Sequence, residues 1–520
     1  MDSRYGTSSS AVASDVSAPV HWVDIAVPVL VLAGTLATLF WPPQIGLANN
    51  GDYQRLLALF GLHYGQLHPL HYERYDNFWV KWFMTGGHST GYYVSSAVPV
   101  IAIAAAINFV LHPGLFDQQV VGVIYTILWS LASYFIIREV RLAYGASIAL
   151  FAGVAGFVVM GDVAYTAYLP TVYSEPASFI FWWALLACAC AMLQQGLRPS
   201  RTVVLLSVAA GTLFLIGKLQ NIVLTPAVIL FWVALDHLLR WPLRRRAMLL
   251  TMLVSCLVAA SAWVLNPPTF DQQNVYDSTF TGIAAPGTPV VEHLKWFGLP
   301  AADARFSGDA FFSPYSWAHQ TQLTRSGFYE KMGMLRIVEF YVTHPRSLWR
   351  AMQASEVASL AMRPDYLGNF QEASGLAPMA KASRMSLWST AKGHLPASLW
   401  VWIAFYVAFC AGLVVSWRRS QTPRERGRVL LCSMIAACAL LQFPVPFVGE
   451  GSNELVKHLY LSDVLTDTMI LITAIWGAGQ LRRGALRRMT RRKRPASDQA
   501  ASDQTISDGI HSVLDDPHRL

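Results

Sequence analysis

A carboxylate stands at the point where the first apolar segment (22–41) gives way to polar residues, in the run Asn49-Asn50-Gly51-Asp52-Tyr53. An ionisable group beside lipid is costly, and such groups usually face a water-filled cavity. Arg55 follows within one helical turn, and a neighbouring cation keeps a carboxylate ionised. Asp52 is therefore our first candidate for a general base. In the alternative interpretation, the run is a turn in which Asp52 only bonds the backbone and caps the next helix.

A second acid lies at the start of another apolar segment, in Tyr173-Ser174-Glu175-Pro176. Glu175 is a further catalytic candidate, and the phenol of Tyr173 could line a sugar-binding site. The same residues also fit an ordinary helix start, which favours an acid in the first turn and tolerates proline there. The sequence leaves both interpretations open.

Polar residues crowd one short connection late in the chain, between two apolar segments. The candidates for substrate binding there are Glu450, Asn453, Lys457 and His458. Helical spacing from residue 453 predicts that Asn453 and Lys457 share a face. Lys457, together with Lys218 from an earlier loop, is a suitable partner for a lipid phosphate. The alternative is a solvated helix start.

Asp76 is a possible additional acid, although Arg74 beside it could equally form an ion pair with it. The same stretch contains potential metal ligands whose spacing matches no zinc template: His63, His68, His71 and Glu73. We therefore predict no metal site. The sequence also contains no glycine-rich nucleotide loop and no serine hydrolase elbow. Without a nucleotide cofactor, a transferred group would arrive on a membrane-soluble carrier.

The composition indicates a membrane protein. Of 520 residues, 54% are hydrophobic and 13% are charged, against about 25% charged in soluble chains. The net charge of +8 does not indicate nucleic-acid binding, because eight of the thirteen residues in 482–494 are Arg or Lys directly after an apolar segment. Such a cluster is typical of a cytoplasmic anchor on anionic lipid. All six cysteines lie within apolar segments, so neither a disulfide framework nor a thiolate metal site is predicted.

Eleven apolar segments are long enough to be membrane-span candidates: 22–41, 93–111, 118–137, 146–160, 177–194, 203–217, 222–239, 248–265, 397–416, 429–447 and 462–479. The short connections rich in arginine should all be cytoplasmic. If these connections and the start of the first helix are cytoplasmic, the chain crosses the membrane ten times. Segment 93–111, which Pro99 and Asn108 interrupt, is therefore expected to lie along the outer membrane face. Both termini are then cytoplasmic and Asp52 is external.

The predicted fold class is an all-α, polytopic membrane protein with 10 to 11 transmembrane helices. The expected regions are a cytoplasmic N-terminal tail (1–21), a transmembrane module (22–265) with an external loop (42–117), a large external loop (266–396), C-terminal transmembrane helices (397–480) and a basic, then disordered, cytoplasmic tail (481–520). The loop 266–396 is rich in aromatic residues, which predicts short packed helices.

These features together resemble the GT-C superfamily of integral-membrane glycosyltransferases, and within it the bacterial glycan hexose transferases. The matching elements are the acid in Asn-Asn-Gly-Asp52, the juxtamembrane segment 93–111, the cytoplasmic turn Arg138-Glu139-Val140-Arg141, the Tyr-Ser-Glu175-Pro run, and Asn453-Glu454-Leu455-Val456-Lys457-His458-Leu459. The resemblance covers most of residues 20–480. One departure is that the paired acids common in that superfamily are absent, because Asp52 is flanked by Gly51 and Tyr53.

The resemblance implies inverting transfer of a sugar from a polyprenyl-phosphate donor to a glycan or lipid acceptor, at the outer face of the bacterial inner membrane. Asp52 and Glu175 would be catalytic, and the substrate-binding residues would be Arg55, Asp76, Tyr173, Lys218, Glu450, Asn453, Lys457 and His458. No metal and no further cofactor is expected. Two alternatives remain: a transporter or flippase of a glycan lipid, which would need a polar track across the membrane, and an oligosaccharide polymerase or ligase.

Overall fold

The structure is a computed structural model that describes residues 19–64, 76–87, 92–313, 323–324 and 327–492. Contacts divide the chain into two compact units, Met1–Leu471 and Ile472–Leu520. The candidate site residues from the sequence all belong to the first unit. The predicted disordered tail beyond residue 492 and most of the N-terminal tail lie outside the described residues.

Eleven apolar helices coincide with the eleven predicted segments. Within the described residues, eight are long and apolar enough to cross a membrane: α1 (Trp22–Phe40), α5 (Gln118–Tyr144), α8 (Glu175–Gln195), η4 with α10 (Leu219–Leu224 and Thr225–Leu239), α11 (Arg245–Leu265), α19 (Leu399–Arg419), α20 with α21 (Pro423–Gln442 and Val445–Glu450) and α23 (Tyr460–Arg492). Three are shorter: α4 (Ala97–Leu111), α6 (Ala146–Met160) and α9 (Arg201–Leu215). This pattern confirms the all-α, polytopic fold class.

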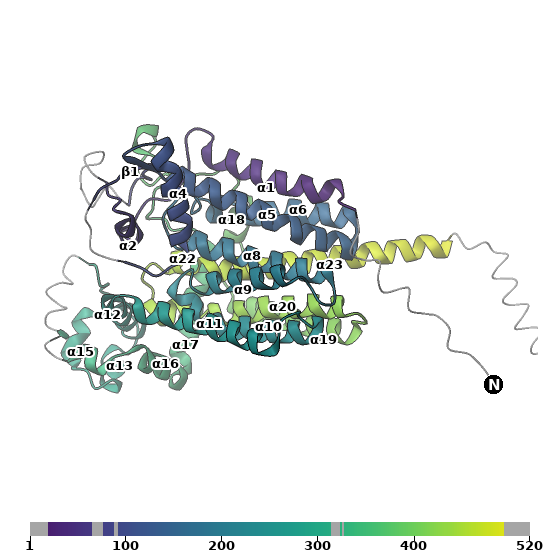
Figure 1. Ribbon diagram of the computed structural model, residues 1–520. Helices are drawn as coiled ribbons and strands as arrows, with labels where there is room; N and C mark the ends of the chain where they lie inside the picture. The colour runs from purple at the N-terminus through teal and green to yellow at the C-terminus, as the bar shows by residue number, and fades with distance from the viewer. Residues whose placement is uncertain (1–18, 65–75, 88–91, 314–322, 325–326, 493–520) are drawn as a thin grey trace, which may run out of the picture. The chain divides into compact units, whose positions relative to one another are not determined.

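Helix α4 is the one that the sequence predicts to lie along the membrane. In Figure 1 it runs across the helices of the bundle, whereas α6 and α9 run along them. Its ends are fixed by polar contacts, since Ser96 N donates to Ile216 O at 3.1 Å and Asn108 Oδ1 accepts from Asp117 N at 3.0 Å. All three short helices have 15 residues, or about 22 Å. Ten crossings therefore require α6 and α9 to cross, and the number remains a prediction.

Ion pairs join the arginine-rich ends of the helices. Asp24 in the first turn of α1 pairs with Arg141 in the last turn of α5 at 2.8 Å. Glu139 of α5 pairs with Arg424 at 2.7 Å and with Arg428 at 2.8 Å, both near the start of α20. The start of α1 and of α20 thus lies beside the end of α5. Helices α1 and α20 therefore run opposite to α5, and the opposite ends of these helices carry the candidate site.

Short elements occupy that opposite end. The loop between α1 and α5 forms α2 (Gln54–Leu57), η2 (Ala58–Phe60) and a two-stranded antiparallel sheet of β1 (Trp82–Met84) and β2 (Leu115–Asp117). Phe83 pairs with Phe116 in the sheet register. Further along the chain, α7 (Val163–Thr166) precedes α8, and α22 (Leu455–His458) precedes α23.

The segment 266–396 is helical, as predicted. It forms α12 (Pro268–Asp277), η5 (Ser278–Ile283), α13 (Val290–Trp296), η6 (Ala301–Phe306), α15 (Phe328–Lys331), α16 (Met334–Thr343), α17 (Pro345–Ala361), η7 (Glu372–Ser374) and α18 (Leu387–Gly393). Its aromatic residues build a core of its own, in which Phe280 stacks on Phe328 with ring centroids 5.5 Å apart. Figure 1 shows α12, α13, α15 and α16 grouped beside one end of the bundle.

Candidate active site

The turn after α1 is built by Asn49, not by Asp52. Asn49 Oδ1 accepts hydrogen bonds from Gly51 N at 2.8 Å and from Tyr53 N at 3.0 Å, which is the usual way an asparagine closes a turn. Gly51 has a φ of 105°, which only glycine adopts without strain. The Asp52 side chain is therefore not needed for the turn, and its carboxylate contacts two cations instead.

Asp52 is held by Lys457 and Arg55. Its Oδ2 lies 2.6 Å from Lys457 Nζ, and its Oδ1 lies 3.1 Å from Arg55 Nη1. Burial alone would raise the pKa of Asp52, but the charges of Arg55 and Lys457 outweigh that effect and hold the pKa well below its ordinary value. Arg55 is itself fixed by α12, because its Nη2 donates to Gln273 Oε1 at 3.1 Å and its guanidinium lies 4.1 Å from the Phe270 ring centre.

The contacts of Asp52 with Lys457 and Arg55 form one set. A second set of contacts starts at Glu175, the first residue of α8. Lys218 Nζ lies 2.8 Å from Glu175 Oε1 and 2.9 Å from His458 Nδ1. An ammonium group can only donate, so Nδ1 accepts and the imidazole proton lies on Nε2. That nitrogen lies 2.7 Å from Glu450 Oε2. His458 is thus aligned between a lysine and a carboxylate.

Lys457 joins these two sets of contacts. Its side chain is fully buried, and Nζ lies 2.6 Å from both Asp52 Oδ2 and Glu454 Oε2. Burial lowers the pKa of a lysine, but the carboxylates of Asp52 and Glu454 raise the pKa of Lys457 well above its ordinary value. Glu454 Oε2 also lies 3.7 Å from His458 Nε2. Asp52 and Glu175, which are distant in sequence, therefore belong to one network of alternating charges.

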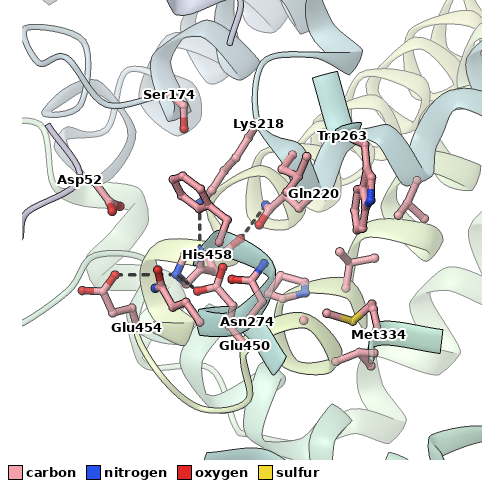
Figure 2. A pocket seen from close by; sticks show the side chains of 18 of the residues that line it. Asp52, Ser174, Lys218, Gln220, Trp263, Asn274, Met334, Glu450, Glu454 and His458 are labelled. Atoms are coloured by element: carbon pink, nitrogen blue, oxygen red, sulfur yellow. Dashed lines mark hydrogen bonds and ion pairs between the residues drawn. The ribbon is translucent and has the colours of Figure 1, made fainter. Parts of the chain in front are cut away.

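The network borders a cavity of about 410 Å³, a volume typical of small-molecule sites. Its charged lining residues are Asp52, Arg55, Lys218, Glu450, Glu454 and His458. Its apolar lining includes Val223, Trp263, Met334, Val338, Leu440 and Leu441. Figure 2 shows Asp52, Glu454 and His458 at one side and Trp263 and Met334 at the other. The cavity is therefore amphipathic, with a charged part and an apolar part.

The apolar part opens at the surface of the helices. Trp263 of α11 is 46% exposed, Leu440 of α20 is 50% exposed and Val223 of η4 is 43% exposed. These residues belong to helices that are apolar enough to cross a membrane. A membrane around the bundle would thus give a hydrocarbon chain access to the cavity.

The comparisons with known proteins agree with this architecture. The model of the family described as YfdI N-terminal transmembrane domain matches residues 11–500. The chain belongs to this family. No curated protein and no solved structure matches the chain. Membership of the YfdI N-terminal transmembrane domain family, together with the apolar helices, establishes a multi-pass membrane protein.

In this member of the YfdI N-terminal transmembrane domain family, the predicted site residues fall into three groups. Six line the cavity: Asp52, Arg55, Tyr173, Lys218, Glu450 and His458. Glu175 and Lys457 lie behind that lining, in direct contact with Lys218 and Asp52. Asn453 and Asp76 are not among the lining residues. Asn453 Nδ2 instead donates to Asp277 Oδ2 at 3.1 Å, and burial raises the pKa of Asp76 to about 6.

The helix predicted from residue 453 begins later. α22 starts at Leu455, and Glu454 has a left-handed backbone with a φ of 47°. The predicted shared face of Asn453 and Lys457 is therefore wrong. The physical reason is that the turn before α22 packs on η5, where Thr281 Oγ1 donates to Glu450 O at 3.2 Å. Left-handed residues of this kind are strained, and they gather at functional sites.

The lining residues that are not among the predicted site residues include the polar side chains of Glu454, Gln220 and Asn274. Glu454 stands in the crowded polar run 450–460, so the sequence contains a signal for it. Gln220 donates from Nε2 to His458 O at 3.0 Å, and Asn274 comes from α12 in the segment 266–396. The sequence pattern does not predict that Gln220 or Asn274 lies at the cavity, because both positions depend on how segments distant in the sequence pack together.

Among the described residues, no group of three or more His, Cys, Asp or Glu side chains is placed to hold a metal ion. His63 is described and forms a bridge with Met84 through its backbone. His68, His71 and Glu73 lie outside the described residues. The predicted absence of a metal site therefore remains a prediction.

Proposed function

We propose that this protein is a membrane glycosyltransferase that moves a sugar from a polyprenyl-phosphate donor to a hydroxyl group of a cell-surface glycan or lipid, with inversion, at the outer face of the bacterial inner membrane. The observation that carries the proposal is that Asp52 and Lys218 share one amphipathic cavity whose apolar part opens on membrane-facing helices. Membership of the YfdI N-terminal transmembrane domain family agrees with a membrane glycosyl-modifying protein.

The charged part of the cavity suits both the acceptor hydroxyl group and the phosphate of the donor. The acceptor hydroxyl oxygen forms a bond with the anomeric carbon as its proton passes to the Asp52 carboxylate. The bond from the anomeric carbon to the phosphate oxygen breaks, and its electron pair leaves with the lipid phosphate. The transition state is oxocarbenium-like. The developing negative charge on the phosphate requires cations more than it requires an acid.

Lys218 and Arg55 are the cations that line the cavity, so we assign the phosphate to them. Glu175 is 3% exposed and binds Lys218 from behind. We therefore assign to Glu175 the positioning of Lys218, not contact with the substrate. Lys457 is fully buried, and its role is to hold Asp52 and Glu454 in place.

Arg55 links phosphate binding to the basicity of Asp52. Arg55 contributes to the low pKa of Asp52. A donor phosphate competes for the Arg55 guanidinium and adds a negative charge near Asp52. Both effects raise the pKa of Asp52. The carboxylate then becomes a better proton acceptor when the donor is bound.

The test is Asp52→Asn in membranes of the producing cell, with mass spectrometry of the surface glycans. Loss of the general base should lower transfer by about 10²–10⁴-fold, so the surface glycans of the variant should lack one sugar. The matched control is Asp365→Asn, because Asp365 is an external carboxylate with a side chain that is 90% exposed. Full modification in Asp52→Asn together with loss in Glu175→Gln would show that the base is misassigned.

The same experiment separates the alternatives. Full modification in both Asp52→Asn and Glu175→Gln would reject sugar transfer in this cavity and favour transport of a glycan lipid. A polymerase or ligase would instead show a loss of whole oligosaccharide units in Asp52→Asn, not of a single sugar. The mass difference between the glycans therefore identifies the unit that is transferred.

A further inference from the structure

Helix α16 in the external segment has two apolar faces. Ile337, Phe340 and Tyr341 are buried in the aromatic core of that segment. Leu335 is 87% exposed, Val338 is 44% exposed and Val342 is 74% exposed. These exposed residues are spaced at i, i+3 and i+7, so they form one stripe along the helix. A helix surrounded by water would not gain from such a stripe.

The stripe adjoins both the cavity and the apolar surface of the bundle. Met334 and Val338 line the cavity, and Trp263 of α11 lines it as well. Figure 2 shows Met334 and Trp263 on the same side of the cavity. Beyond Trp263, the end of α11 exposes Val264 (77%) and Leu265 (55%). The exposed apolar residues therefore continue from a membrane-span candidate to α16.

Basic residues precede and follow the stripe in the sequence. Arg346 and Arg350 in α17 are exposed, as is Lys331 at the end of α15. An apolar face with Lys and Arg beside it is the pattern of helices that lie in the membrane interface. The cations then meet anionic lipid headgroups, and the apolar side chains reach the acyl chains.

We propose that α16 lies in the lipid interface of the membrane face that carries the cavity. In this position Leu335, Val338 and Val342 contact acyl chains, and Arg346 and Arg350 contact phospholipid phosphates. The mouth of the cavity between α11 and α16 then opens sideways into lipid, not into water. This inference concerns lipid contact and does not depend on sugar transfer.

The test uses the full-length protein in vesicles of phosphatidylcholine and phosphatidylglycerol. Val342→Cys is labelled with the fluorophore NBD, and two quenchers are compared, a doxyl lipid and aqueous iodide. Ala302→Cys is the matched control, because Ala302 is an exposed residue of η6 in the same segment. The unsubstituted protein gives the background from the six native cysteines.

The proposal expects the doxyl lipid to quench the label at residue 342 more strongly than the label at 302, and iodide to do the reverse. Equal iodide quenching at both positions would overturn it. Protection of residue 342 from both quenchers would also overturn it, since a second copy or another protein would then cover the stripe. Leu335→Cys provides a second reporter if Val342→Cys does not fold.

Discussion

Substitution of Lys457 by methionine is the most direct perturbation of the charge network. The ammonium group is fully buried and lies 2.6 Å from Asp52 Oδ2 and 2.6 Å from Glu454 Oε2. Methionine keeps the length and the apolar part of the side chain but removes the charge. Asp52 and Glu454 are then left facing each other without the cation between them.

Breaking a buried ion pair by removing one partner costs about 3–5 kcal/mol, because an uncompensated charge stays buried. The side chains of Asp52 and Glu454 are each 25% exposed, so water reaches them in part. We therefore expect Lys457→Met to lower the free energy of unfolding by about 3 kcal/mol, at the lower end of that range. Arg55 remains beside Asp52 and limits the loss further.

The assay is the unfolding midpoint of the purified protein in detergent, measured for Lys457→Met and for Lys295→Met. Lys295 is an exposed lysine of α13, and its substitution should leave the midpoint unchanged. Neutralising both acids in Lys457→Met, with Asp52→Asn and Glu454→Gln, should restore most of the lost stability. Equal midpoints for the two lysine variants, or no recovery after neutralisation, would refute this account of the network.

Burial, with the nearby charge of Glu450, raises the pKa of Asp277 to about 8, so the folded protein keeps a proton there that the unfolded chain loses near pH 4. Stability should therefore fall between about pH 4 and 8 by up to about 1.4 kcal/mol per pH unit, and unfolding midpoints of Asp277→Asn should lack that slope. Gly451→Ala should lower stability and sugar transfer, because its Cβ would lie 2.3 Å from Thr281 Oγ1 at a φ of 63°. Gly449→Ala, with nothing within 4 Å of the added Cβ, should leave the unfolding midpoint unchanged. Lys218→Met should raise the KM for the lipid-phosphate donor by about 10- to 100-fold, the effect of losing one charged contact.

The membrane helices could be predicted from the sequence because their signal is local. A run of apolar residues long enough to span a bilayer has few alternatives to a helix, since the backbone must satisfy its own hydrogen bonds. Pro99 and Asn108 marked 93–111 as different, and that segment forms α4, which lies across the bundle in Figure 1. The sequence also predicts that acids at every second helix end along the chain lie near one another, because antiparallel helices bring those ends to the same side.

The details of the site depend on packing, which the sequence does not reveal. The left-handed Glu454 results from contacts between the turn 450–453 and η5, two segments far apart in the chain. The side of the cavity that α12 contributes, including the Gln273 contact to Arg55, likewise depends on how the segment 266–396 packs. Spacing rules predicted a regular helix from residue 453 because they consider only neighbours in sequence.

The two lysines show why residue type alone could not assign roles. Both were predicted as partners of a lipid phosphate, and both bind carboxylates in the structure. Lys218 lines the cavity with a side chain that is 13% exposed, whereas the side chain of Lys457 is fully buried. A phosphate can approach only the first without moving protein atoms. Under the proposed function, the same chemical group would bind substrate at one depth and align the acids at another, and only the packing around each lysine decides between these roles.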